Sequence, residues 1–252
     1  MEEEFAAGED PAAKPRSRLL PSPWLGSSRY NFNARIRLFY LAGVGTPAYL
    51  YPHWVSQEMH ERFPAVEIAA IELPGHGDHK GVPFHDYVEC ARALAAELQR
   101  IHFNKEDKRM QPFAIYGYSL GSRIAAELAA ILKGPNGEQC KKLYVGGRAA
   151  PHIENPAIMM RPELEEETSS TARQNVAEAL NEIDNMSPEQ VRDMMINTLE
   201  PTISADSLSK YQRMFEKYIQ KEPGELYAFA KATLSDNSMA AGPFKAISNE
   251  QE

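Results

Sequence analysis

Residues 117–121 read Gly-x-Ser-x-Gly and lie between a predicted strand and a predicted helix, which constrains the fold more than any other feature of the chain. Residues 112–118 are apolar and β-prone, and the residues that follow Ser119 are rich in Ala and Leu, as in a helix. So tight a strand-to-helix turn requires Gly117 and Gly121 on either side of the serine. The Ser119 oxygen would then stand at the C-terminal edge of a sheet, before a helix N-terminus that stabilises negative charge. We therefore predict that Ser119 is a nucleophile, with a structural serine as the alternative.

Strand and helix signals alternate over the first part of the chain. The strand candidates are short apolar runs without polar alternation, which is typical of strands buried on both faces. Their order predicts an α/β fold, in which a mostly parallel sheet carries helices on both faces. The predicted strands are 35–41, 66–73, 112–118 and 142–146, and the predicted helices are 51–63, 84–101 and 120–132.

The chain as a whole divides into four predicted segments. We expect a disordered tail and approach segment over 1–30, an α/β core over 31–153, a helical lid-like insert over 154–225 and a loose tail over 226–252. Within the insert, Ser187 is a predicted helix N-cap, because Pro follows in the first turn and Gln at the third position. Inserts of this kind often cover catalytic pockets, and an ordinary helical subdomain is the alternative.

A loop of small residues, 42–45, follows the first predicted strand. Acyl transfer needs two backbone N–H donors for the oxyanion, one from the residue after the nucleophile and one from a loop after an earlier strand. Leu120 would supply the first donor, and the 42–45 loop suits the second, with a plain turn as the alternative.

Charge and composition exclude several classes of partner. The net charge is −8, which argues against nucleic acid as the main partner. The chain has no apolar run long enough for a membrane span, and its acidic N-terminus does not read as a secretory signal. Cys90 and Cys140 are expected to be free thiols in a reducing cytoplasm. We expect no metal site, since no histidine pairs at ligand spacing accompany them, and no cofactor.

Several segments together resemble the type II thioesterases, which include the medium-chain acyl thioesterase of fatty-acid synthesis and the editing thioesterases of polyketide and non-ribosomal peptide synthesis. The resemblance implies an α/β-hydrolase-like fold with a helical lid. It is carried by residues 23–24, 37–39, 42–43, 72–75, 117–121, 147–152, 199–201 and 205–206.

This resemblance implies an enzyme that hydrolyses an acyl thioester, held on the phosphopantetheine arm of a carrier protein or on coenzyme A. Ser119 would attack the carbonyl and form an acyl-enzyme, which water then clears. Ala42 and Leu120 match the family's oxyanion positions. His152 does not match the family's base and is expected to be structural. His76 is expected to be a loop histidine, because the base of this fold follows the last strand.

The sequence departs from the family after the lid segment. The family has two more strands there, with a triad Asp and a Gly-His-Phe-type run that carries the catalytic histidine, whereas the last histidine here is His152. We therefore expect no histidine nitrogen within hydrogen-bond reach of Ser119, and weak activity, because a serine without its base is a poor nucleophile. The hypotheses are a thioesterase that is incomplete at its C-terminus, a hydrolase-fold protein that binds without catalysis, and a carboxylesterase or lipase.

The surface carries two further expectations. Without later strands, the strand over 143–146 would lie at an exposed edge of the sheet, which invites aggregation. An acidic carrier protein would need a basic patch on this acidic chain. The candidates are Lys141, Lys142, Arg148 and Arg161, with ordinary solvated surface as the alternative.

Overall fold

The computed structural model describes most of the chain in eight stretches. They are residues 22–26, 34–48, 57–104, 109–110, 112–133, 140–147, 178–200 and 204–241. Of the tails expected over 1–30 and 226–252, residues 1–21, 27–30 and 242–252 lie outside the described residues, and so do residues 154–177 and 201–203 of the expected insert.

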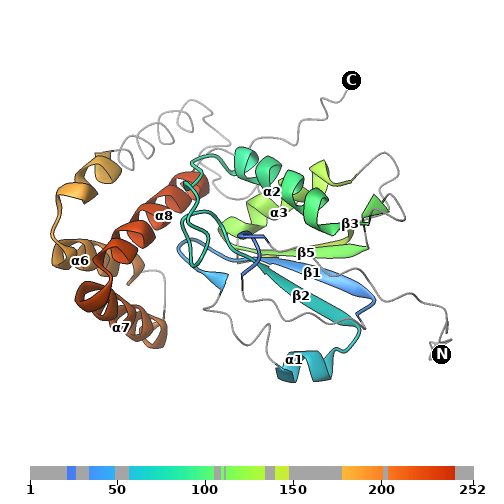
Figure 1. Ribbon diagram of the computed structural model, residues 1–252, viewed down its shortest axis with the longest axis horizontal. Coiled ribbons are helices and arrows are strands. Elements are labelled where there is room, and N and C mark those ends of the chain that lie inside the picture. Colours follow the sequence, from blue (N-terminus) through green and yellow to red (C-terminus); the bar gives the residue numbers. More distant parts are fainter. Residues whose placement is uncertain are drawn as a thin grey trace, which may run out of the picture.

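A four-stranded parallel sheet forms the centre of the molecule (Figure 1). Its strands are β2 (Val66–Ile71), β1 (Ile36–Leu41), β5 (Phe113–Tyr118) and β6 (Cys140–Gly146), in that spatial order. All three pairings are parallel, with Leu41 opposite both Ile71 and Gly117. The four strands predicted from the sequence are confirmed; β1, β2 and β5 are mostly buried, whereas β6 is largely exposed.

Two helices, α2 (Tyr87–His102) and α3 (Leu120–Ile131), pack against each other over one face of the sheet (Figure 1). The main hydrophobic core lies between these helices and the strands, and it includes Phe39, Leu94 and Leu128, none of which is exposed. The predicted α/β-hydrolase-like arrangement is thus confirmed. The short hairpin of β3 (Phe103–Asn104) and β4 (Arg109–Met110), which the sequence did not predict, follows α2.

The other face of the sheet is covered more thinly in the described part of the chain. A smaller cluster that includes Tyr40 and Ile68 lies there, with Met59 of α1 (Gln57–Arg62) packed against it. The first part of the helix predicted over 51–63 lies outside the described residues. The expected exposure of β6 is confirmed, since Leu143, Tyr144 and Val145 keep 40%, 52% and 59% of their surfaces accessible.

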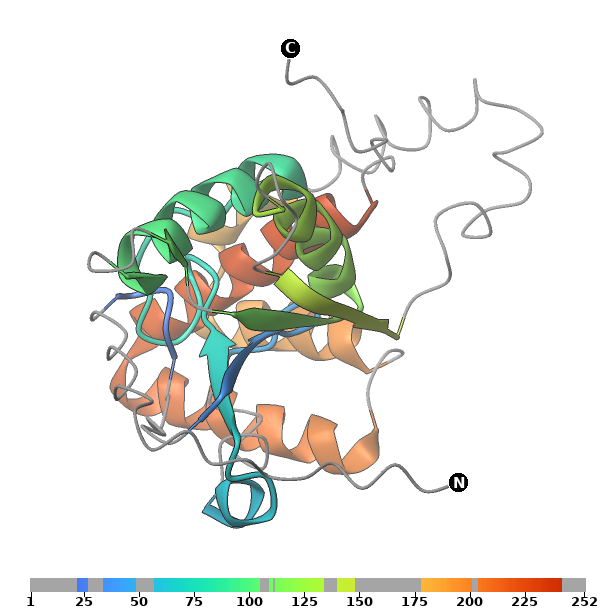
Figure 2. The ribbon, with the colours of Figure 1, turned by 90° about the vertical axis from the view of Figure 1, so that its right-hand side faces the viewer.

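A helical subdomain, residues 178–200 and 204–241, lies beyond the C-terminal ends of the strands (Figures 1 and 2). It contains a 3-10 turn η2 (Ile183–Asn185) and the helices α6 (Pro188–Leu199), α7 (Ala205–Lys221) and α8 (Pro223–Ala241). The three helices pack around their own core, with Met195, Phe215 and Leu226 fully buried. The N-cap predicted at Ser187 is confirmed, because its hydroxyl accepts the Gln190 N–H and the Gln190 side chain accepts the Ser187 N–H.

Helix α8 corrects one prediction. We expected a loose tail from residue 226, but residues 223–241 are helical. Small and apolar side chains in this stretch suit close packing. Leu226, Phe229 and Ala230 enter the core of the helical subdomain, while Met239 enters the main core. Tertiary burial therefore makes a helix of a segment whose polar composition suggested a tail. Among the described helices, none is both long and apolar enough to cross a membrane.

Candidate active site

Ser119 occupies the turn between β5 and α3 in a backbone conformation that is costly for a residue with a side chain. Its φ is 52° and its ψ is −117°, and among the described residues it is the one non-glycine with a positive φ. Such a conformation costs about 1–3 kcal/mol, so the surrounding structure must hold it. The Ser119 N–H donates to the Gly146 carbonyl at 2.8 Å, and the Ser122 hydroxyl donates to that oxygen at 2.8 Å. The predicted strained turn at the C-terminal edge of the sheet is confirmed.

The two flanking glycines are required by close backbone approach. A Cβ on Gly117 would lie 2.2 Å from the Gly121 carbonyl oxygen, and a Cβ on Gly121 would lie 2.3 Å from the Leu41 carbonyl oxygen. The Gly121 N–H also donates to the Ala42 carbonyl at 3.1 Å. The turn is therefore pressed against the end of β1, which explains why the motif needs glycine at both positions.

The Ser119 side chain lies over the loop that follows β1. A Cβ built on Gly43 would be 3.3 Å from the Ser119 Cβ and 3.8 Å from its Oγ. The predicted neighbourhood of Ser119 and the Ala42-Gly43 loop is thus confirmed. Helix α3 begins at Leu120, directly after the serine, so Ser119 lies between the Gly43 backbone and the first turn of α3.

The same loop is bound by two helices of the helical subdomain through Gly45. Asp236 of α8 accepts the Gly45 N–H at 2.9 Å, and the Tyr211 hydroxyl of α7 donates to the Gly45 carbonyl at 3.2 Å. A Cβ on Gly45 would meet the Thr233 Oγ1 at 2.9 Å, so α8 approaches this backbone closely. These contacts bind α7 and α8 to the loop that passes beneath Ser119.

His76 and Asp236 form a buried pair beside this loop. The His76 Nε2 lies 3.0 Å from the Asp236 Oδ2, and both side chains are 2% exposed. The contact is within ion-pair range, but it is not aligned as a hydrogen bond. On the other side of the ring, the His76 Nδ1 lies 3.3 Å from the Pro74 carbonyl, which can only accept a proton. Both ring nitrogens therefore face oxygen acceptors, an arrangement that suits an imidazolium.

Charge around His76 favours its protonated form. Burial alone would lower the pKa of His76, but the Asp236 carboxylate, with help from Glu72 and the Pro74 carbonyl, outweighs burial and raises it. Burial also raises the pKa of Glu72, although the Ala48 N–H that it accepts at 3.0 Å acts in the opposite direction. A protonated histidine between two acceptors can stabilise the contact between the loop after β2 and α8. Because it already carries its proton, it is poorly suited to accepting one from Ser119.

Other histidines lie elsewhere. His102 is buried beside Arg37, Phe39 and Phe113, near the N-terminal end of β1. His79 contacts the Trp24 ring edge-on and faces the Glu72 carbonyl, and burial lowers its pKa. No hydrogen bond joins Ser119 to a histidine whose side chain the structure describes.

The remaining residues singled out from the sequence lie partly outside and partly within the described residues. His53, His152, Arg148 and Arg161 lie outside the described residues, as does the side chain of His60. Lys141 and Lys142 are exposed on β6. Cys90 and Cys140 are free thiols. The described residues contain no group of His, Cys, Asp and Glu able to hold a metal ion.

Comparison with known proteins sets this geometry in a family. The sequence model of the thioesterase domain family matches residues 37–246, which span the sheet, the Ser119 turn and the described helical subdomain. This chain belongs to the thioesterase domain family. The resemblance seen in the sequence motifs is thereby confirmed at the level of the family.

Proteins similar to this thioesterase-family chain include two curated relatives and one solved structure. "Linear gramicidin dehydrogenase LgrE" of Brevibacillus parabrevis is 28% identical over 60% of this chain and 54% of its own length. "Thioesterase PikA5" of Streptomyces venezuelae is 32% identical over 48% of this chain and 40% of its own. The chain thus spans about half the length of the curated relatives it matches. The solved type II thioesterase BorB, from the borrelidin biosynthetic cluster, has a TM-score of 0.48 at 18% identity, over 90% of this chain and 70% of that one.

Proposed function

We propose that this thioesterase-family chain hydrolyses acyl thioesters with Ser119 as the nucleophile, acting on acyl groups carried by phosphopantetheine. The observation that carries the proposal is the strained Ser119 turn, which stacks the serine on the Ala42-Gly43 loop. A backbone conformation of this cost persists where the surrounding structure fixes it, and such residues cluster at active sites. Family membership and the relative thioesterase PikA5 support the thioester as the bond that is cleaved.

In this mechanism the Ser119 Oγ attacks the thioester carbonyl. The N–H groups of Ala42 and Leu120 bind the oxyanion as it forms, and the N-terminus of α3 adds favourable potential. The carbon–sulfur bond then breaks, leaving an acyl-Ser119 ester and a pantetheine thiol, and water hydrolyses the ester. A thiol has a pKa near 8.5, so a thiolate leaves with less help from an acid than an alkoxide does. The Ser119 hydroxyl proton passes to solvent water and ends on the departing pantetheine sulfur, because no described residue accepts a hydrogen bond from this hydroxyl.

The helical subdomain has a proposed place in this reaction. We extend the lid-like insert expected over residues 154–225 through α8, because α7 and α8 both bind Gly45 beside the serine. An acyl chain on Ser119 would then lie between the strand ends and this subdomain. Location in the cytoplasm stays a prediction from the sequence.

The test is an assay of hexanoyl-pantetheine hydrolysis, in which the release of free thiol is measured over time. We expect slow turnover that Ser119→Ala abolishes and that Ser209→Ala, at an exposed serine of α7, leaves unchanged. A p-nitrophenyl ester assayed in parallel separates the thioesterase from the carboxylesterase or lipase alternative, which predicts faster ester cleavage. Equal rates for wild type and Ser119→Ala would refute the proposal.

A second candidate is a protein that binds acyl-pantetheine without cleaving it. It is favoured by one observation, the absence of a hydrogen bond between Ser119 and any described histidine side chain. Saturable binding of hexanoyl-pantetheine with no Ser119-dependent thiol release would support it over the enzyme.

A further inference from the structure

A line of four cations runs along α7. Lys210, Arg213, Lys217 and Lys221 follow one another at spacings of three, four and four residues, which places them on one side of the helix. All four are exposed. At about 1.5 Å rise per residue, Arg213 and Lys221 lie roughly 12 Å apart along the helix axis. We call these four residues the α7 basic stripe.

The α7 basic stripe has no counter-ions within the described part of the chain. None of its four residues takes part in an ion pair there. Glu216, which precedes Lys217 on α7, is paired instead with Arg192 of α6 at 2.9 Å. Asp206 lies in the first turn of α7, one turn before the stripe begins. This concentration of free positive charge stands out on a chain whose net charge is −8.

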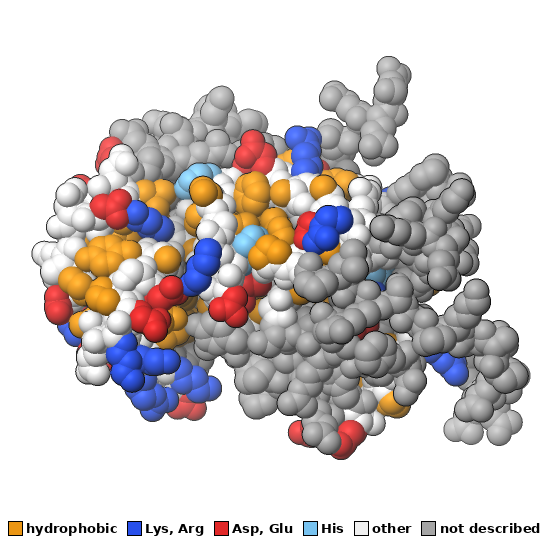
Figure 3. Space-filling view, viewed as in Figure 1, with side chains coloured by type: hydrophobic (Ala, Val, Ile, Leu, Met, Phe, Trp, Pro, Cys, Tyr) orange, Lys and Arg blue, Asp and Glu red, His pale blue; other side chains and the backbone are white. Residues whose placement is uncertain are grey.

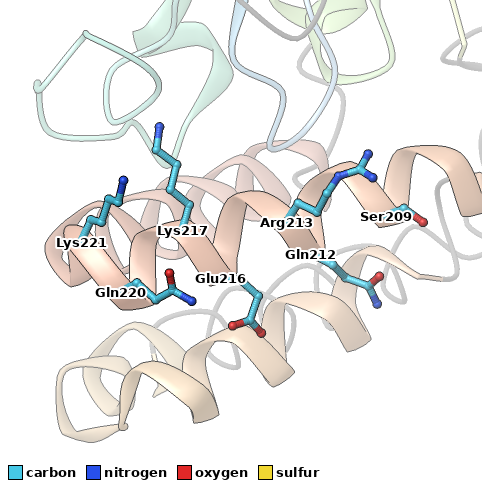
Figure 4. Close-up of a pocket in the computed structure, with 7 residues that line it drawn as sticks. All are labelled: Ser209, Gln212, Arg213, Glu216, Lys217, Gln220 and Lys221. Carbon is cyan, nitrogen blue, oxygen red and sulfur yellow. The ribbon is translucent and has the colours of Figure 1, made fainter.

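The stripe also has a defined orientation. Figure 4 shows Arg213, Lys217 and Lys221 extending from one side of α7, toward the loops of the core, while Glu216 points the other way, toward α6. Together with Glu216, Ser209, Gln212 and Gln220 they line an open groove along the helix, in which three cations accompany one carboxylate that is paired with Arg192. In the space-filling view, a group of basic side chains lies on this corner of the molecule (Figure 3).

The side of α7 that faces the core contacts the loop beside Ser119. Tyr211 is buried, and its hydroxyl donates to the Gly45 carbonyl, two residues from the Gly43 that underlies Ser119. The helix that carries the stripe is therefore bound to the loop that we propose as part of the oxyanion hole. A partner seated on the stripe would therefore contact the helix that holds this loop.

We propose that the α7 basic stripe is the docking surface for an acidic helix of the phosphopantetheine carrier protein. The proposal rests on the proposed function and names the surface through which its substrate arrives. An acidic partner is repelled by a chain of net charge −8 except where the local sign reverses, and the stripe is such a place beside the site. Carboxylates one turn apart on a partner helix would match the spacing from Arg213 to Lys217 and Lys221.

Docking is tested first by binding, so that catalysis is not needed. The probe is a bacterial fatty-acid acyl carrier protein carrying a fluorophore on its phosphopantetheine thiol, with anisotropy measured at two salt concentrations. The variant is Arg213→Glu with Lys217→Glu, and it is compared with Lys141→Glu and Lys142→Glu on β6, the rival basic patch suggested by the sequence, which changes the net charge equally. We expect the α7 variant to raise Kd at least about tenfold at low salt and less at high salt, and the control to change Kd less than about twofold.

The neutral pair Arg213→Gln with Lys217→Gln guards against a folding defect, and each variant is checked by its thermal melt. A raised Kd in the Gln pair with an unchanged melt supports docking. An unchanged Kd in the Glu pair, or an equal loss in the β6 control, overturns it. Hydrolysis of hexanoyl-pantetheine, which lacks a carrier protein, should be the same for wild type and the α7 variant. Its absence in both would refute the proposed function while leaving the binding result to decide docking.

Discussion

At the scale of single residues, the Ser119 turn depends on close contacts between the backbone of its two glycines and neighbouring carbonyl groups. The turn could be predicted from the sequence because its close backbone contacts leave room only for glycine on either side of the serine. The Gly-x-Ser-x-Gly motif records this requirement locally. His76 and Asp236 show the opposite case. Their pairing depends on the chain from residue 77 to residue 235 folding so that α8 reaches the loop after β2, and no local pattern encodes this. The sequence suggested that His76 was a loop histidine, and the structure adds the carboxylate that holds it.

The steric requirement at Gly117 yields the first prediction. Gly117→Ala would place a methyl group 2.2 Å from the Gly121 carbonyl oxygen, a backbone atom that cannot move alone. We expect a loss of about 3 kcal/mol or more in the free energy of unfolding, measured by urea denaturation. Gly224→Ala in the first turn of α8 is the control, since nothing lies within 4 Å of the new methyl group. It should be neutral or stabilising by up to about 1 kcal/mol. A Gly117→Ala protein as stable as wild type would show that the turn is looser than described.

The protonated state of His76 gives the second prediction. Its pKa is raised in the folded protein, chiefly by Asp236 acting against burial, above an unfolded value of about 6.5. The stabilisation is therefore complete below about pH 6.5 and is lost as pH rises through the folded-state pKa. We expect melting temperature to fall above neutral pH in wild type and to depend less on pH in His76→Gln. His85→Gln, at an exposed histidine, should retain the wild-type slope. Identical slopes in all three proteins would contradict a charged His76.

At the scale of secondary-structure elements, α8 joins the helical subdomain to the core. Its first half packs with Phe215 of α7, its Asp236 binds the loop after β1, and its Met239 enters the main core. The sequence predicted α3 and α6, which both contact α8, better than α8 itself, because they have strong start signals and clear apolar positions. Helix α8 carries apolar, small and polar residues without a clear apolar stripe, so its sequence shows little helical periodicity, and its polar end suggested a tail.

The third prediction concerns the contact of α8 with the loop. Asp236→Ala leaves the Gly45 N–H and the charged His76 buried without their partner, which we expect to cost about 3–5 kcal/mol of stability. Asp236→Asn keeps an acceptor for Gly45 and should recover part of that loss. Asp184→Ala is the control, because Asp184 pairs with Lys231 at the surface and should contribute less than about 1 kcal/mol. Chemical denaturation separates the three. An Asp236→Ala loss as small as that of Asp184→Ala would remove the proposed fastening role.

At the scale of the whole molecule, the described sheet ends at β6 with apolar side chains exposed. An open edge with apolar side chains is a site for association between chains. The fourth prediction is that Val145→Lys reduces light scattering on concentration, while changing the free energy of unfolding by less than about 0.5 kcal/mol, because Val145 is 59% exposed. Val82→Lys, at a loop residue that is 84% exposed, should leave scattering unchanged. Equal scattering from wild type and Val145→Lys would show that β6 does not drive association.

The most direct test of the central claim is intact-protein mass spectrometry after incubation with excess hexanoyl-pantetheine, followed by peptide mapping. The account predicts a single added hexanoyl group on the peptide that contains Ser119, absent from Ser119→Ala and present in Ser209→Ala. Loss of the adduct over time in buffer would report deacylation by water. An acyl group found on another residue, or thiol release that is equally fast in wild type and Ser119→Ala, would contradict the assignment of Ser119 as the nucleophile.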